Sequence, residues 1–371
     1  MRRSSVRIRE LAFQPNNMTK LLQRINELAK VGASDAGINR PSGSPQDQIA
    51  RGLIINWMME TGLTVRLDDH QNIIGRLEGH GKTICVGSHI DTVSTAGKYD
   101  GVLGVLAGIE AAEQLQGKLT HPLEVCVFSD EETSMAGSIG YANDNRDLKA
   151  FLELHVEQGP VLDCQGIDIG VVEGIVGQRR SLLTVHGQAN HAGTTPMNMR
   201  NDALVKAAGV VQYVSKRAQD FDGLVATVGQ LTVYPNTFSV VPGLIEFTLQ
   251  VRDLSSETME EFVHDVCQQY GIVGNITHSS EPALCDAGLQ RIIERACVLS
   301  NLKSTKMPSR ASHDAQNFIH CPMGMIFVPS VGGISHSPKE HTTDDQCLNG
   351  LKVLTSTIEQ VDQWSQSTSS S

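Results

Sequence analysis

Amphipathic stretches and short apolar runs alternate along the first third of this chain, and this alternation constrains the fold most. Apolar residues at helical spacing fill residues 18–32 and 45–61, and residues 101–115 repeat that period. Short apolar runs bounded by Gly, Asp and Asn lie among these stretches, at residues 73–74, 83–87 and 123–128. Strands that alternate with helices of about 10–15 residues are typical of α/β folds with a largely parallel sheet.

The middle of the chain follows a different pattern. Alternating residues predict strands at 180–187, 227–233 and 244–251. Helical spacing predicts helices at 202–219 and 256–270, which suggests a small α+β domain with two helices on one face of its sheet. Residues 150–155 and 323–328 are predicted strands of the larger sheet, which resumes after this insertion.

We therefore predict an α/β catalytic domain with a mostly parallel central sheet and a smaller inserted α+β domain. The catalytic domain is expected to be discontinuous, with residues 1–177 and 286–371, and the insertion is expected to span 178–285. The tail 363–371 ends in Ser-Gln-Ser-Thr-Ser-Ser-Ser and is predicted to be disordered.

Charge and cysteine content narrow the function classes. The 371 residues include 30 Lys and Arg against 41 Asp and Glu, a net charge of −11, which argues against a general nucleic-acid binder. No apolar run approaches the roughly 18 residues of a membrane span. The basic start MRRSSVRIRE lacks the apolar stretch of a secretory signal, and the eight cysteines form no CxxC pair, so we expect reduced thiols and a cytoplasmic location.

Polar residues capable of chemistry gather in five short segments. These are Ser88-His89-Ile90-Asp91, Tyr99-Asp100-Gly101, Asp130-Glu131-Glu132, Leu154-His155-Val156-Glu157-Gln158-Gly159 and Ser335-His336-Ser337-Pro338. Four of them lie at or just beyond the carboxyl end of a predicted strand. Because ligands of open α/β sheets bind outside those strand ends, we expect the segments to converge.

The residue types in these segments suit a pair of divalent ions. Imidazoles and carboxylates are ligands of zinc and manganese, and one carboxylate can bridge two ions about 3.5–4 Å apart. One ion would take His89 and His155. The other would take Glu132 and His336, and Asp100 would bridge the two ions.

Two further carboxylates have predicted roles near those ions. Asp91 is two residues after His89, so in an extended chain both side chains point to one side and Asp91 can orient the imidazole. Glu131 precedes Glu132 and faces elsewhere in an extended segment, so it need not be a ligand. A free carboxylate beside the ions can act as general base.

Other interpretations of the same residues remain open. Glu131 and Glu132 can simply begin a helix, because its positive end favours acidic residues. His89 and Asp91 with a distant His also fit the two-His-one-carboxylate pattern of iron oxygenases, although that leaves Asp100 without a role. The chain has no GxGxxG after a strand and no GxxxxGK[ST], which argues against nucleotide binding.

Eight segments follow one another along nearly the whole chain: GSHIDTV (87–93), YDGVLGVLAGIEA (99–111), DEETSMAGS (130–138), ELHVEQGPVL (153–162), IVGQRR (175–180), NHAGTTPM (190–197), VVPG (240–243) and GISHSPKEHT (333–342). Together they resemble the two-metal amidohydrolases related to aminoacylases and carboxypeptidase G, specifically the N-carbamoyl branch. That branch includes N-carbamoyl-L-amino-acid hydrolase, allantoate amidohydrolase, ureidoglycolate amidohydrolase and β-ureidopropionase.

The resemblance implies a role for each matching position. The ligands of one ion match His89, Asp100 and His155, and those of the other match Asp100, Glu132 and His336. Glu131 matches the catalytic base, and we count Asp91 and His191 with it as catalytic residues.

Substrate recognition is also implied by the resemblance. His191 matches a lid histidine that reaches a neighbouring subunit's site and stabilises the oxyanion, which implies a homodimer formed through the inserted domain. Gln158 and Arg252 match substrate-binding positions, and Arg252 can bind the substrate carboxylate with two hydrogen bonds. Without the resemblance, Arg252 would be interpreted as a solvated strand residue.

Two departures from the family pattern affect the substrate pocket. Ser239 occupies the position of a substrate-binding Asn. The Ser side chain is shorter, so we expect its contact with the substrate to differ or to be relayed by water. Around His313 the branch usually has GAGHDA, whereas this chain has Arg310-Ala311-Ser312-His313-Asp314-Ala315. Neither departure touches the predicted metal ligands.

The resemblance implies a metal-dependent hydrolase that cleaves the carbamoyl C–N bond of a small N-carbamoyl amino acid or allantoate-like ureido acid and releases ammonia and carbon dioxide. Its cofactors are expected to be two divalent ions per subunit, zinc or manganese. One alternative is an aminoacylase or dipeptidase that uses the same metals. Another is a binding protein of the same fold that has lost catalysis. No nucleic-acid or membrane partner is expected.

Overall fold

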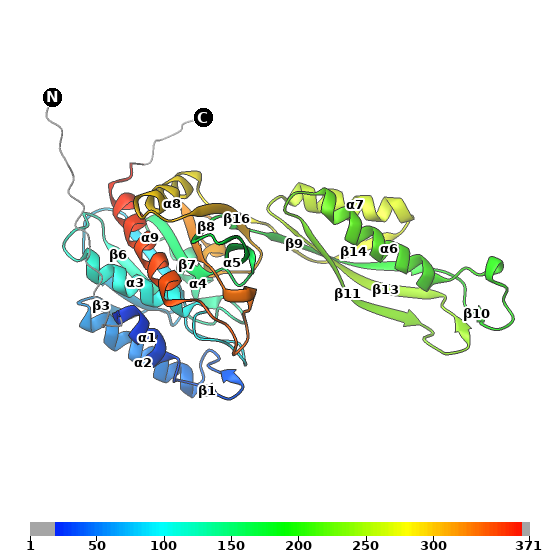
Figure 1. The fold of residues 1–371 in the computed structure, drawn as a ribbon, viewed down its shortest axis with the longest axis horizontal. Helices are drawn as coiled ribbons and strands as arrows, with labels where there is room; N and C mark the ends of the chain where they lie inside the picture. The colour runs from blue at the N-terminus through cyan, green and yellow to red at the C-terminus, as the bar shows by residue number, and fades with distance from the viewer. Residues whose placement is uncertain (1–18, 366–371) are drawn as a thin grey trace, which may run out of the picture.

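The computed structural model describes residues 19–365 and places them in two bodies, a large one and an elongated inserted one (Figure 1). The start MRRSSVRIRE and residues 366–371, for which we made predictions, lie outside the described residues. The last helix extends to Gln363, so the first residue of the predicted disordered tail is helical.

The large body is built on a nine-stranded mixed sheet. From one edge to the other its strands are β15 (Ala283–Leu284), β8 (Ile169–Ile175), β17 (Met323–Val328), β7 (Leu148–Val156), β5 (Thr83–His89), β6 (Leu123–Phe128), β4 (Ile73–Leu77) and β3 (Thr64–Leu67), and β16 (Ser304–Ser309) pairs with β8. The central strands β17, β7, β5 and β6 run parallel to one another. On one side the pairs β6–β4 and β4–β3 are antiparallel, and on the other side the pairs β17–β8 and β8–β15 are antiparallel. The predicted α/β fold with mainly parallel central strands is confirmed.

Helices cover both faces of the large sheet, and this explains why its central strands are continuous apolar runs. One apolar core holds side chains from α1 (Lys20–Leu28), α2 (Pro45–Glu60), α3 (Val102–Leu115), α8 (Ala287–Leu299) and α9 (Asp344–Gln363). The core on the other face holds side chains from α4 (Ala136–Asn143) and α5 (Val161–Gln165). Short elements complete this body: β1 (Ala33–Ser34), β2 (Gly37–Ile38), η3 (Asp314–Asn317) and η4 (Val331–Gly333).

The glycines of α3 let this helix lie close to the sheet. A Cβ at Gly104 would lie 2.2 Å from the carbonyl oxygen of Leu154, a distance that no side chain tolerates. The helix therefore packs directly on β7 and places its N-terminus at the carboxyl ends of the central strands.

The inserted body is a four-stranded antiparallel sheet in the order β11 (Val225–Tyr234), β13 (Leu244–Asp253), β9 (Gly177–His186) and β14 (Val273–Ser280). The helices α6 (Ala203–Arg217) and α7 (Ser256–Tyr270) cover one face and enclose a third core. The remaining elements are β10 (Asn190–His191), β12 (Val240–Val241), η1 (Met197–Met199) and η2 (Ala218–Asp220). The strand β14 was not predicted, because its sequence is polar and its side chains are mostly exposed at an edge.

The chain enters and leaves the inserted body through two neighbouring strands. Gln178 near the start of β9 pairs with Ser280 at the end of β14. The next strand, β15, already pairs with β8 of the large sheet. No helix within residues 19–365 has both the length and the apolar character that a membrane crossing requires.

Candidate active site

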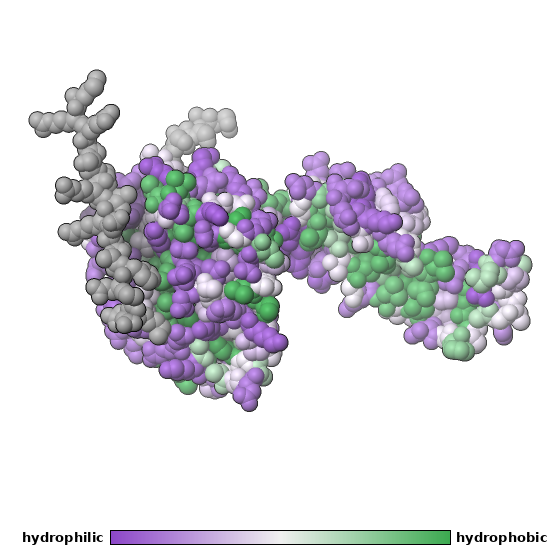
Figure 2. Space-filling view, in the orientation of Figure 1, coloured by the Kyte–Doolittle hydropathy of each residue, from purple (hydrophilic) through white to green (hydrophobic). Residues whose placement is uncertain are grey.

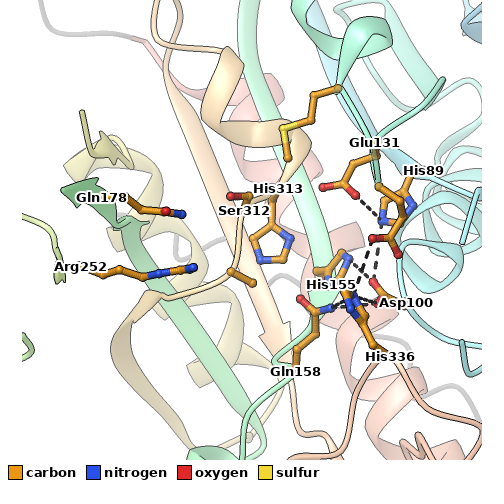
Figure 3. Close-up of a pocket in the computed structure, with 13 residues that line it drawn as sticks. His89, Asp100, Glu131, His155, Gln158, Gln178, Arg252, Ser312, His313 and His336 are labelled. Carbon is orange, nitrogen blue, oxygen red and sulfur yellow. Dashed lines mark hydrogen bonds and ion pairs between the residues drawn. The ribbon is translucent and has the colours of Figure 1, made fainter. Parts of the chain in front are cut away.

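A cleft of about 290 Å³ lies at the carboxyl ends of the central strands (Figure 3). His89 ends β5, Glu131 follows β6, and His155 is the last but one residue of β7. The side chains that line the cleft belong to His89, Asp100, Glu131, Glu132, Met135, His155, Gln158, Gln178, Arg252, Ala311, Ser312, His313 and His336. Gln178 and Arg252 reach in from the inserted body, opposite the cluster of histidines and carboxylates.

The two oxygens of the Asp100 carboxylate face different imidazoles. Its Oδ1 lies 3.1 Å from Nε2 of His155 and 3.7 Å from Nε2 of His89. Its Oδ2 lies 3.3 Å from Nε2 of His336, whose Nε2 is also 3.7 Å from Oε2 of Glu132. The structure thus brings all five predicted ligands together, in two groups that share Asp100.

Backbone carbonyls set the orientation of the two buried imidazoles. Nδ1 of His89 is 3.0 Å from the carbonyl oxygen of Asp91, and Nδ1 of His155 is 2.9 Å from that of Val156. Each Nδ1–H donates to its carbonyl, and this orientation turns the Nε2 side of each ring toward Asp100.

The electrostatics of this cluster favour a positive charge. The pKa of His89 lies well above its usual range, because nearby Glu131, Asp91 and Asp100 outweigh a burial effect that acts in the opposite direction. Burial would raise the pKa of Asp100, yet hydrogen bonds from His155 and His336 hold it well below its usual range. Imidazoles packed among carboxylates in this way need protons or a cation to offset the negative charge.

The donor set fits a divalent cation. Oε1 of Glu132 is buried and has no hydrogen-bond partner among the described residues. A buried carboxylate oxygen without a partner costs free energy, and a bound cation would satisfy it. Three imidazoles and two carboxylates, of which Asp100 is shared, are typical ligands of zinc or manganese.

Glu131 forms a further group with His89 and Glu132 but belongs to neither of the two groups that contain Asp100. Its side chain is buried, and its Oε2 is 3.6 Å from Nε2 of His89. Burial, followed by the charges of Asp314 and Glu132, raises the pKa of Glu131 well above its usual range, although His89 opposes this. A carboxylate with a raised pKa is a stronger proton acceptor once ionised.

Asp91 holds the segment of Glu131 in place. The backbone amide of Glu131 donates to Oδ1 of Asp91 at 3.3 Å, and that of Glu132 donates to Oδ2 at 3.2 Å. We predicted that the Asp91 side chain orients His89. Its Oδ1 lies 3.6 Å from Nδ1 of His89, and the carbonyl of the same residue makes the shorter contact at 3.0 Å. The Asp91 carboxylate also accepts hydrogen bonds from the two amides of the turn after β6.

The backbone around the cleft adopts sparsely populated conformations. Four residues other than glycine have a positive φ near the cluster: Asp130 (60°), Met135 (55°), Gln158 (58°) and His336 (51°). Such conformations persist where surrounding contacts enforce them, and they concentrate at functional sites. Gly101 also has a positive φ, and a Cβ there would lie 2.5 Å from the ring of His89.

Glu340 supports the cluster, although sequence reasoning gave it no role. Its Oε1 accepts hydrogen bonds from the amides of Tyr99 at 2.8 Å and Asp100 at 3.2 Å. Burial and the charge of Asp100 raise its pKa to about 7. The only sequence signal was an acidic residue four positions after His336.

Gln158, predicted to bind substrate, contacts the cluster itself. Its Nε2 donates to Oδ2 of Asp100 at 2.9 Å and to Oγ of Ser335 at 3.1 Å. It is therefore placed at the edge of the predicted metal site, within reach of a substrate held there.

Beside the cluster lie buried polar residues to which sequence reasoning also gave no role. The ring of His313 packs edge-on against that of His155 at 4.4 Å between centroids, and burial holds its pKa well below the usual range. Burial and the charge of Glu153 raise the pKa of Asp314 to about 8. Both shifts favour neutral side chains at this depth.

Two predicted residues lie far from the cleft of their own chain. His191 is exposed on β10, at the distal end of the inserted body, and Ser239 lies beside it. Nδ1 of His191 accepts hydrogen bonds from the amides of Gly193 at 3.0 Å and Thr194 at 3.2 Å. The ring proton is therefore on Nε2, which is available to donate to another molecule.

Comparison with known proteins places this site in a family. The model of peptidase family M20/M25/M40 matches residues 85–360, which include all five predicted metal ligands and Glu131. The chain belongs to this family. The match confirms the resemblance stated from the sequence segments.

Members of the M20/M25/M40 family with similar sequences carry names from the N-carbamoyl branch. The chain is 35% identical to the N-carbamoyl-L-amino acid amidohydrolase of Geobacillus stearothermophilus, over 93% of this chain and 98% of that protein. It is 33% identical to the allantoate amidohydrolase of Bacillus subtilis, over 89% and 94% respectively. A putative amidohydrolase/peptidase from Burkholderia cenocepacia has a similar solved structure, with a TM-score of 0.84, 29% identity and coverage of 93% and 98%.

Proposed function

We propose that this M20/M25/M40 family member hydrolyses the carbamoyl C–N bond of a small N-carbamoyl amino acid or allantoate-like ureido acid, with release of ammonia and carbon dioxide. The observation that carries the proposal is the Asp100 carboxylate, whose two oxygens face separate imidazoles, with Glu131 beside them. The names of the similar proteins support the substrate class.

The proposed cofactors are two divalent ions, zinc or manganese. His89, Asp100 and His155 would hold one, and Asp100, Glu132 and His336 would hold the other. Bound there, the ions would act as Lewis acids and would lower the pKa of a nearby water.

Proton transfer is assigned to Glu131. Its carboxylate would take the proton of the attacking water and deliver it to the nitrogen that leaves the carbamoyl carbon. Asp91 supports this role, because its two oxygens hold the amides of Glu131 and the next residue. Water attack and C–N cleavage then leave carbamic acid, which decomposes to ammonia and carbon dioxide.

The inserted body would supply substrate recognition. Arg252 enters the cleft, and the charged neighbour that shifts its pKa downward, after burial, is Arg180 rather than a carboxylate, so its guanidinium can bind the carboxylate of the substrate. Gln158 would contact the ureido group from the other side. Ser239 lies beside His191 at the distal end, so these two would serve the cleft of a second subunit.

A homodimer formed through the inserted body is part of the proposal, since His191 needs a second chain to reach a cleft. Nε2–H of His191 of the partner subunit would donate to the carbonyl oxygen and stabilise the oxyanion. Near His191 the side chain of Phe238 is fully exposed, and Met197 and Met199 are 77% and 72% exposed. Apolar residues also gather on the surface of this body (Figure 2), and its edge strands β11 and β14 are open to pairing.

We propose that the protein acts in the cytoplasm, and its cysteines support this. All eight are free thiols within the described residues, as expected in a reducing compartment. We also retain the proposed domain bounds, with 178–285 as the unit that carries dimerisation and substrate recognition.

A substrate panel tests the proposed function. The purified protein, loaded with zinc in one series and manganese in another, is incubated with N-carbamoyl amino acids, allantoate and N-acetyl amino acids. We expect ammonia from the ureido acids and little free amine from the acetyl compounds. Free amine from the acetyl compounds without ammonia from any ureido acid would favour the aminoacylase alternative. Binding of ureido acids without turnover in either metal would favour the binding protein.

A further inference from the structure

The segment between β16 and η3 connects the cleft with the inserted body. Ala311, Ser312 and His313 line the cleft, whereas the preceding residue, Arg310, is exposed and turns toward the inserted body.

Two hydrogen bonds cross between the bodies at this point. Nη2 of Arg310 donates to the carbonyl oxygen of Gly223 in the inserted body at 3.0 Å. In return, Nη1 of Arg252 donates to the carbonyl oxygen of Arg310 at 2.7 Å. Each arginine thus binds the backbone of the opposite body, and we call this pair of hydrogen bonds the arginine clasp.

The clasp acts on the strand pair that carries Arg252. Gly223 lies two residues before Val225, and Val225 is the register partner of Arg252 in the ladder of β11 and β13. The loop that Arg310 holds is therefore next to the backbone from which Arg252 extends. One bond of the clasp holds the loop of Gly223, and the other holds the guanidinium of Arg252.

The clasp leaves Arg252 able to bind an anion. A guanidinium has five N–H donors, and the bond to Arg310 uses one of them. Arg180 lies diagonally across β9 and β13 from Arg252, because Gln250 pairs with Arg180 and Arg252 pairs with Gln178. The two neighbouring arginines keep the local charge positive and favour a carboxylate between the bodies.

We propose that Arg310 is a positioning residue: through Gly223 it fixes the inserted body against the large body and thereby places Arg252 for the substrate carboxylate. This inference rests on the proposed function, because it takes the substrate to be a ureido acid with a carboxylate. It adds a residue that lies outside the predicted metal and catalytic groups.

Kinetics of variants test the proposal. R310A removes the bond to Gly223, and R310K retains the charge and one donor. The exposed Arg291 on α8 provides the matched control R291A, which removes an equal charge from the large body. We expect R310A to raise KM for a ureido acid about fivefold, as for the loss of about 1 kcal/mol, with kcat within about twofold. R310K should recover part of the KM, and R291A should match the wild type.

A double variant asks whether Arg310 acts through Arg252. In the R252A background, R310A should change KM by less than about twofold, because the side chain that it positions is already absent. An equal increase of KM in both backgrounds would overturn the positioning role. An unchanged KM in R310A itself would overturn it too.

A measurement without substrate separates this proposal from the proposed function. Hydrogen–deuterium exchange followed by mass spectrometry reports on the loop around Gly223 in the metal-loaded protein. We expect exchange in peptides covering residues 220–226 to be several-fold faster in R310A than in the wild type or R291A. Unchanged exchange in R310A overturns the clasp. If the wild type cleaves no ureido acid, the proposed function fails, while the exchange data still decide whether the clasp exists.

Discussion

The backbone amide of Asp100 donates a hydrogen bond to Oε1 of Glu340, across 240 positions of sequence, at 3.2 Å. The amide of Tyr99 donates to the same oxygen at 2.8 Å. The loop that carries the shared carboxylate is thus held by a side chain from the segment of His336, which belongs to the second ligand group. The Glu340 carboxylate therefore connects the loop of Asp100 with the segment of His336 in the candidate metal site.

E340A should weaken metal binding, because the loop of Asp100 loses the acceptor for two amides. Groups that orient metal ligands in this way typically contribute about 10- to 100-fold in affinity. E340Q retains an acceptor oxygen and should stay within about threefold of the wild type. Competition with a chelator of known affinity measures both values. Equal metal affinity in E340A and the wild type would show that Glu340 does not support the site.

E131Q should reduce turnover by about three orders of magnitude or more, because an amide cannot accept the proton of the attacking water. Its metal content should remain nearly that of the wild type, since Glu131 is absent from both ligand groups around Asp100. Elemental analysis and ammonia release from the same preparation measure the two quantities. Near-normal turnover would remove Glu131 from the mechanism, and loss of metal would make it a ligand instead.

Mixed dimers should regain activity that neither parent has. In the proposed dimer, a cleft needs Glu131 of one chain and His191 of the other. A mixture of E131Q and H191A chains therefore forms hybrids with one intact site, and ammonia release should rise to about a quarter of the wild-type rate after full exchange. Two affinity tags verify the exchange of subunits. Absence of recovery in verified hybrids would contradict the shared site.

The stability of the protein should depend on Asp362 in a defined pH range. Oδ1 of Asp362 accepts a hydrogen bond from the amide of His121 at 2.8 Å and lies 3.0 Å from Nδ1 of the same histidine. These contacts connect α9 to the loop before β6. These contacts outweigh burial and lower the pKa of Asp362. A carboxyl group whose pKa is lowered by folding stabilises the folded state at pH values above its unfolded pKa of about 3.9. This contribution disappears as the pH falls through the pKa of the folded state.

D362N should therefore lose about 1–2 kcal/mol of unfolding free energy at pH 6–7. The difference from the wild type should shrink toward zero as the pH falls below about 4. Urea denaturation across this range measures it, and D69N, at an exposed position, is the matched control. A difference that stays constant with pH would mean that the charge of Asp362 does not contribute.

The convergence of the five candidate ligands could be predicted because chemistry and topology agreed. His89, Glu132 and His155 follow apolar runs that become adjacent parallel strands, so their convergence required only the order β6, β5 and β7 in the sheet. A strand that is buried on both faces has a strong apolar signal, and its carboxyl end can be located from the sequence.

Other features depend on contacts between distant segments, which the sequence around each residue does not indicate. Glu340 acts through a backbone amide far away in sequence, and nothing in its own segment indicates that partner. Asp91 was expected to orient His89, and nothing in its segment indicated that its carboxylate also accepts hydrogen bonds from two amides after β6. The strand β14 is polar and lies at an edge, so its formation depends on pairing with β9 rather than on an apolar pattern.

The paired junction of Gln178 and Ser280 gives the inserted body the properties of an exchangeable module. Entry and exit lie side by side, so residues can be added to or removed from the far end without altering the spacing at the attachment point. Under the proposed function, changes there would alter which ureido acid is accepted while the candidate metal site stays intact. Protein engineers could exploit the same junction to transplant recognition elements between relatives.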